Sequence, residues 1–126
     1  MSLSNTFETT TLIWLLTADA ATRPTAWYLA LYTAAPSDAG GGTEVSGGSY
    51  ARKAVSFTVS GDTASNSAAV EFDVATAAWG TISHIGVFDA SSGGNLIAYA
   101  ALTASKTIDD GDVLRVPAGD LDITMD

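Results

Sequence analysis

The chain has no cysteine, a single histidine and only five cationic side chains in 126 residues. Without cysteine it has no disulfides, no thiolate zinc sites and no cysteine nucleophile. With His84 alone, any metal site that needs two imidazoles is excluded, and only one base remains for a Ser-His-Asp arrangement. We therefore expect a protein that is not an enzyme and that needs neither a cofactor nor a metal.

Positive charge is scarce, because five Lys and Arg stand against 14 Asp and Glu, for a net charge of −9. Binding to nucleic acid depends on cations that neutralise phosphates, and an anionic membrane surface also attracts basic segments. Long apolar runs are lacking too, since the clearest one, residues 12–16, is far shorter than the roughly 20 residues of a membrane span. We expect neither nucleic acid nor a membrane as a partner.

What the chain does have is apolar material, at 47% hydrophobic against 15% charged residues. That composition is typical of a folded protein with a core, and the length predicts one domain over residues 1–126. The acidic side chains concentrate late, since residues 64–126 contain nine acids and two bases. An acidic surface keeps a protein soluble and steers basic partners.

One helix is predicted, from Asn5 to Thr17. Asn5 and Glu8 have the spacing of a capping box, in which each side chain bonds the free backbone N–H of the other residue. Four apolar side chains are interpreted as one face of this helix, namely Phe7, Leu12, Leu15 and Leu16. We expect that face to pack either on the protein's own sheets or on a neighbouring molecule.

After Pro24 the apolar period changes from helical to two, which is typical of strands. Strands are predicted at residues 27–32, 50–59, 69–74, 81–89, 95–102, 106–108, 113–116 and 121–125. Short strands separated by Gly, Asp and Ser turns favour an all-β fold, an antiparallel β-sandwich of about seven to eight strands with one N-terminal helix. The strands at 81–89 and 95–102, and those at 106–108 and 113–116, are expected to form hairpins.

Few residues suggest a site. The glycine-rich loop at residues 34–48 contains Gly40, Gly41 and Gly42, and it either moulds to a partner or is a solvated connection. Trp79 is an aromatic anchor of a core or an interface, and His84 is interpreted as a strand histidine, half-buried or at an interface. The candidate interface residues are Phe7, Leu12, Leu15, Leu16, Gly40, Gly41, Gly42, Trp79 and His84.

Four stretches carry a resemblance to a known family. They are WYLALYTAAP at residues 27–36 with EVSGGSYAR at 44–52, WGTISHIGVFDA at 79–90, and GGNL at 93–96. As a set they resemble small virion proteins of tailed phages that are labelled phage tail fibre proteins. The resemblance covers nearly the whole chain, and it offers no catalytic residues.

The resemblance implies a structural component of the virion that contacts other tail or capsid proteins. Three roles stay open: a tail fibre or fibre-attachment subunit, which we favour, a decoration protein of the capsid, and a module that binds a glycan of the host surface through tryptophans. Because virion parts occur in rings, we expect a homo-oligomer of cyclic symmetry, with a trimer as the first expectation.

Overall fold

Strand β2 (Tyr28–Ala34) is an interior strand of the main sheet, because neighbouring strands cover both of its edges. The computed structural model describes residues 1–125. One edge of β2 pairs with β8 (Gly80–Phe88), and the other is shared by two short strands, β3 (Thr43–Glu44) and β4 (Lys53–Ala54). Beyond β8 lie β9 (Leu96–Ile108) and then β1 (Ser2–Leu3), so the antiparallel order is β1-β9-β8-β2-β3, with β4 also on β2.

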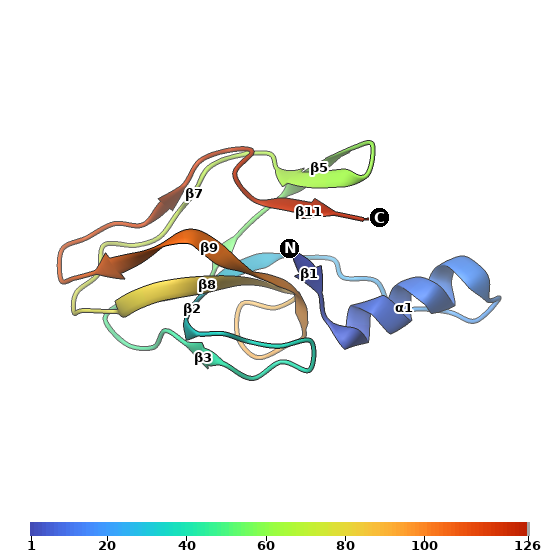
Figure 1. Ribbon diagram of the computed structural model, residues 1–126, viewed down its shortest axis with the longest axis horizontal. Coiled ribbons are helices and arrows are strands. Elements are labelled where there is room, and N and C mark those ends of the chain that lie inside the picture. Colours follow the sequence, from blue (N-terminus) through green and yellow to red (C-terminus); the bar gives the residue numbers. More distant parts are fainter. Residues whose placement is uncertain (126) are drawn as a thin grey trace.

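Two smaller antiparallel sheets form the second layer of the sandwich (Figure 1). One contains β5 (Phe57–Ser60), β6 (Thr63–Asn66) and β11 (Asp122–Thr124), and the other pairs β7 (Val70–Glu71) with β10 (Arg115–Val116). The predicted fold class, an antiparallel β-sandwich with an N-terminal helix, is confirmed.

The core lies between the two layers. Leu29, Leu31 and Val87 face it from the main sheet, and Phe72 and Leu114 face it from the second layer, all of them at most 5% exposed. Burial of such side chains stabilises a fold by about 1.5–3 kcal/mol each. Three aromatic rings meet in this core, with the Tyr50 ring 6.1 Å from that of Phe72 and 5.4 Å from that of Trp79.

The opposite face of β2 is buried as well. Ala30 and Tyr32 are buried there together with Phe88 and Leu96. The guanidinium of Arg52 lies 3.6 Å above the Phe88 ring and covers it. This smaller cluster has no second sheet over it, so loops and Arg52 provide its cover.

Arg52 is held by a polar cluster at the β2–β3 edge. Its Nε and Nη2 donate to the two carboxylate oxygens of Glu44 at 2.9 and 2.8 Å, and its Nη1 donates to the carbonyls of Ala90 and Gly93. The hydroxyl of Tyr50 donates to the same Glu44 at 2.7 Å. Burial raises the pKa of Glu44, but the hydrogen bonds from Arg52 and Tyr50 lower it, and the balance holds it below its ordinary value of 4.5.

The N-cap of helix α1 (Asn5–Leu16) lies one residue before the predicted one. Ser4 is the N-cap, with an extended backbone and a side chain that accepts a hydrogen bond from the Phe7 N–H at 3.5 Å. The prediction that Asn5 caps the helix through a box with Glu8 is therefore wrong, since Asn5 already has helical geometry. Ser4 is 3% exposed and also donates its hydroxyl to the Leu96 carbonyl at 2.6 Å, which joins the helix to β9.

Three predicted strands have different boundaries in the structure. Residues 50–59 do not form one strand, because the chain passes from the main sheet, where Lys53–Ala54 pairs with β2, to the second layer, where Phe57–Ser60 pairs with β6. Residues 95–102 and 106–108 belong to the single strand β9, which pairs with β8 through an irregular register between Ile82 and His84. The first hairpin, β8 with β9, is confirmed.

The predicted hairpin of residues 106–108 with 113–116 is wrong. Arg115–Val116 pairs with Val70–Glu71 in the other layer, so the acidic turn at residues 109–112 carries the chain between layers. Within that turn the Asp112 carboxylate accepts from the Asp109 N–H at 2.9 Å, which gives it a structural role. Strand β6 was not predicted from the sequence. Lys53 forms an ion pair with Asp73, with 2.8 Å between Nζ and the carboxylate oxygen.

Replacing Glu44 with Gln should destabilise the fold, because it leaves the Arg52 guanidinium, whose side chain is 8% exposed, without its counter-charge. We expect the free energy of unfolding to fall by about 3 kcal/mol at neutral pH, as when one partner of a buried ion pair is removed. Urea denaturation measures the change. Glu71→Gln is the control, because that carboxylate lies 4.0 Å from Arg115 in an exposed pair worth less than about 1 kcal/mol.

The same comparison has a defined pH dependence. Since the folded pKa of Glu44 lies below its ordinary value of 4.5, the stabilisation is complete above pH 4.5 and is lost as the pH falls through the folded pKa. The stability difference between the wild type and Glu44→Gln should therefore shrink below pH 4.5. A difference that stays constant as the protein is acidified would contradict this role of Glu44.

Replacing Ser4 with Ala should fray α1 and loosen its attachment to β9. The change removes the N-cap acceptor and the hydrogen bond to Leu96, and loss of a cap costs about 1 kcal/mol. Far-ultraviolet circular dichroism should report less helix, whereas Ser2→Ala, at an exposed serine outside the cap, should leave the signal unchanged. An unaltered helical signal for Ser4→Ala would refute the assignment.

Candidate functional site

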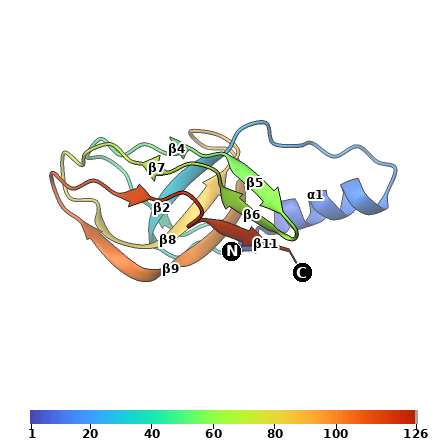
Figure 2. The same cartoon turned by 90° about the horizontal axis from the view of Figure 1, so that it is seen from above.

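The N-terminal arm, which we define as residues 5–24, projects from the sandwich (Figures 1 and 2). It consists of α1 and the irregular segment that returns to β2. No residue of α1 is buried. Three of the four candidate helix residues are more than half exposed, with Leu12 at 57%, Leu15 at 60% and Leu16 at 76%, and Trp14 is 70% exposed.

The arm has two different sides. Phe7 lies with Thr10, Thr11 and Trp14 around a shallow hollow against the returning residues 21–24. Leu12, Leu15 and Leu16, spaced by three and four residues, share the outward side of the helix. The interpretation of all four candidates as one face is therefore wrong for Phe7, because a step of five residues turns the helix by about 140°.

Nothing in residues 1–125 covers the outward leucines. A helix of 12 residues is at the limit of stability in water when it stands alone, and most helices are stabilised by packing of an apolar face. This one also contains four threonines, whose branched side chains lower helix propensity. The sequence left two alternatives for the apolar face of the helix, and the structure does not show its leucines packed on the protein's own sheets.

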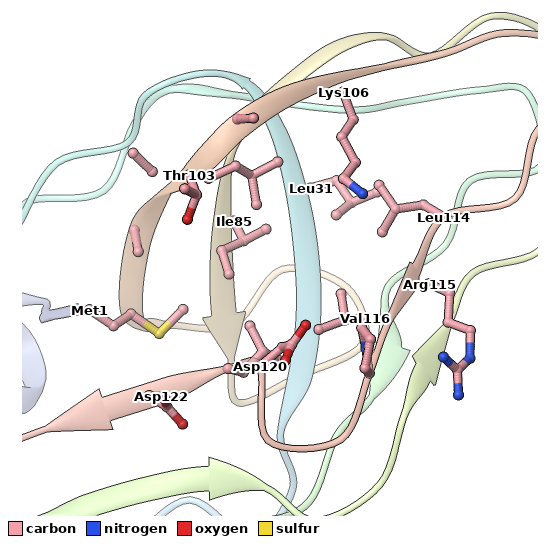
Figure 3. A pocket seen from close by; sticks show the side chains of 16 residues that line it. Met1, Leu31, Ile85, Thr103, Lys106, Leu114, Arg115, Val116, Asp120 and Asp122 are labelled. Carbon is pink, nitrogen blue, oxygen red and sulfur yellow. The ribbon is translucent and has the colours of Figure 1, made fainter.

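A groove opens between β9 and the segment that contains β10 and the start of β11 (Figure 3). Its volume is about 380 Å³. Leu31 and Ile85 of the main sheet form its base, and Leu114 and Val116 lie on the opposite wall. The groove therefore reaches core side chains from outside, because the second layer does not extend over this part of β9.

The rim of the groove mixes small and charged side chains. The β9 side has a run of small residues, Ala100, Ala101 and Ala104, and ends at Lys106. Asp120 and Asp122 stand on the other side. Sequence reasoning missed this groove, because its residues come from five strands and the segments between them, and none of them has an unusual local pattern.

The glycine loop borders a second, polar cavity of about 420 Å³. Gly40, Gly41 and Gly42 all have positive φ, and Gly42 is packed so closely that a Cβ there would lie 2.7 Å from the backbone nitrogen of Pro36. The backbone carbonyl of Asp38, in the same loop, accepts a hydrogen bond from the Asn5 N–H at 2.9 Å. The loop thus supports the root of the arm, while Gly40 and Gly41 face open space.

Trp79 and His84 lie elsewhere. Trp79 is a core residue, 5% exposed, and its indole N–H donates to the Gly48 carbonyl at 2.9 Å. His84 is half-buried in β8, between Tyr32 of β2 and Ala101 of β9, and its Nδ1 bonds the hydroxyl of Ser83 at 2.8 Å. The structure brings neither of them to the arm.

Among residues 1–125 no group of three His, Cys, Asp or Glu is placed to hold a metal ion. No helix in that part of the chain is long and apolar enough to cross a membrane. Of the three tryptophans only Trp14 is exposed, since Trp27 is half-buried and Trp79 is in the core, so they form no exposed cluster for stacking on sugars.

Comparison with known proteins identifies the family. No curated protein gives a significant match to the sequence. A family described as "Podophage GP4 fiber I protein gp80" matches residues 2–124, which include the arm, both layers and nearly the whole chain. This confirms the resemblance to phage tail fibre proteins and the location in the virion. The chain belongs to the Podophage GP4 fiber I protein gp80 family and is a structural fibre component of a phage particle.

Proposed function

We propose that the chain is a non-enzymatic subunit of a tail fibre, or of the attachment of a fibre to the tail, and that the arm joins it to a neighbouring virion protein. The observation that carries this proposal is the uncovered apolar side of α1, with Leu12, Leu15 and Leu16 each more than half exposed. Contiguous apolar surface of this kind marks interaction sites on soluble proteins.

The body of the protein supports an architectural role. Within residues 1–125 no buried side-chain nitrogen or oxygen lacks a hydrogen-bond partner, so the sandwich holds no strained polar group of the sort that marks reactive sites. The one histidine bonds a neighbouring serine in its own strand. A nucleophile, a base and an orienting acid are not assembled around it, as acyl-transfer chemistry would require.

The copy number of this chain in each phage particle distinguishes a tail protein from a capsid decoration protein. Fibres are present in small numbers, whereas a decoration protein covers a capsid in proportion to its subunits. We expect quantitative mass spectrometry of purified particles to give only a few copies of this chain per hundred copies of the major capsid protein. A ratio near one to one, or one to three, would refute the tail assignment and favour the decoration role.

A further inference from the structure

We propose that the polar cavity beside the glycine loop binds an uncharged carbohydrate. The cavity has a volume of about 420 Å³, within the range of roughly 300–1,000 Å³ that small-molecule pockets have. It lies on the face of the main sheet that the second layer does not cover, away from the outward side of α1. The inference does not depend on the role of the arm, and it adds a binding activity to that of a structural subunit.

The hydroxyl of Tyr32, at the base of the cavity, carries the proposal. The side chain is 4% exposed, and its ring stacks on Phe88 with 6.4 Å between the ring centres. No group within residues 1–125 forms a hydrogen bond with this hydroxyl. The oxygen is therefore accessible from the cavity, since no fully enclosed side-chain oxygen in that part of the chain lacks a partner. A tyrosine hydroxyl this deep in a protein usually has a partner, and here only a molecule in the cavity can supply one.

The same hydroxyl keeps its proton at neutral pH. Burial, and after it the Glu44 carboxylate, raises the pKa of Tyr32 above its ordinary value of 10. A protonated phenol both donates and accepts a hydrogen bond. Tyr32 can therefore bond a ligand hydroxyl in either direction.

Two further oxygens on the lining are held in place by the protein and left free. One carboxylate oxygen of Asp38 accepts the Tyr99 hydroxyl at 2.5 Å, and the other has no partner among residues 1–125. The amide nitrogen of Asn95 donates to the Asp89 carboxylate at 3.1 Å, so in the described chain the amide oxygen is the unbonded end. Both groups are acceptors whose orientation is set before a ligand arrives, which lowers the cost of binding.

The glycine loop that carries Asp38 forms a fixed wall of the cavity. Ser37 and Gly40 exchange backbone hydrogen bonds of 2.9 and 2.8 Å, and the Asp38 carbonyl accepts the Asn5 N–H. A Cβ at Gly40 or Gly41 would meet nothing within 4 Å, so this part of the rim is open. The loop thus holds the carboxylate in place and leaves the entrance clear.

The charges around the cavity exclude an anionic ligand. Asp38 and Glu44 face a single cation among the described lining residues, Arg52. Each nitrogen of that guanidinium already bonds Glu44 or a backbone carbonyl, so it is not available to a phosphate or a carboxylate. A free anion would also meet the unpaired charge of Asp38.

Two kinds of cationic ligand also lack their usual binding groups here. The Arg52 guanidinium lies 3.6 Å above the Phe88 ring, so this face is closed to a quaternary ammonium. No group of three metal-binding side chains occurs within residues 1–125. The free groups are acceptor oxygens and one hydroxyl, and adjacent hydroxyl groups on a sugar ring complement them.

Binding is tested with the isotope-labelled full chain, whose backbone amide signals are followed by NMR as a sugar is added. The probes are glucose, galactose and mannose, each compared with its own uronate, which has the same ring and one negative charge. At least one neutral sugar should shift the amide signals of residues 38–42 and 93–96 until they saturate. Its uronate should bind about threefold more weakly or worse, because its charge repels that of Asp38.

Tyr32→Phe is the sharpest variant, because it removes an oxygen that bonds nothing in residues 1–125. Affinity should fall about fivefold, as for the loss of one hydrogen bond between uncharged groups, while the urea midpoint stays that of the wild type. Asp38→Asn keeps the acceptor for Tyr99 and turns the free acceptor into a donor, so affinity should fall about 10-fold or more. Tyr28→Phe, the same change on the same strand but outside the cavity, should leave affinity unchanged.

Four results would overturn the proposal: no neutral sugar shifts these amides, the shifts occur at the arm instead, a uronate binds more tightly than its neutral sugar, or Tyr32→Phe binds like the wild type. A purely structural Tyr32 hydroxyl would lower the urea midpoint and leave the affinity of the folded protein unchanged. These measurements are made on the purified chain, whereas copy number in particles tests the tail assignment. Either proposal can therefore fail while the other stands.

Discussion

The ion pair between Arg52 and Glu44 stabilises the edge of the main sheet formed by β3 and β4, where the strands are too short to be stable through their own hydrogen bonds. β3 and β4 are two residues each, and strands that short add few ladder hydrogen bonds. Arg52 compensates because every one of its nitrogens is bonded: two to Glu44 and one to the carbonyls of Ala90 and Gly93. One side chain thus joins β3, the segment before β4 and the connection from β8 to β9.

The same cluster reaches both hydrophobic cores. The Tyr50 hydroxyl accepts the Leu31 backbone N–H at 3.0 Å and donates to Glu44, while its ring packs with Phe72 and Trp79 between the layers. On the other face of the sheet, the Arg52 guanidinium covers Phe88. A buried ion pair contributes little net stability compared with apolar packing, but removing one of its partners is costly. In this fold the ion pair acts mainly by fixing the positions of the loops that Arg52 contacts.

How far the sequence predicts this fold depends on the kind of signal that each segment carries. β2 and β8 are predicted well because large apolar side chains alternate along them, as at Leu29 and Leu31. β6 escapes prediction because Thr63–Asn66 contains only small and polar side chains, without any apolar period. The break at Val55 is invisible for another reason: the period of two continues through the point where the chain changes layers.

The candidate site shows the same limit. The apolar content of the arm was evident in the sequence. The structure leaves the candidates Leu12, Leu15 and Leu16 exposed, whereas Phe7 lies against the returning chain. The groove was not predictable, since it depends on where the second layer stops short of β9. Trp79 illustrates the ambiguity of aromatic residues, because the same side chain suits a core and an interface, and only the layers around it decide.

The contrast between body and arm suggests how folding and assembly are divided in this protein. The sandwich satisfies its buried polar groups within residues 1–125 and carries an acidic surface, so free subunits repel each other and stay soluble. The arm differs from the sandwich, because its apolar side chains are exposed to water and its helix is too short to be stable on its own. Exposed apolar side chains of this kind are expected where a partner covers them, as in the proposed role of the arm. Ser4 fixes the direction of the arm from the sheet, so in the proposed role a partner would meet a helix that is already oriented, and less ordering would be needed on docking.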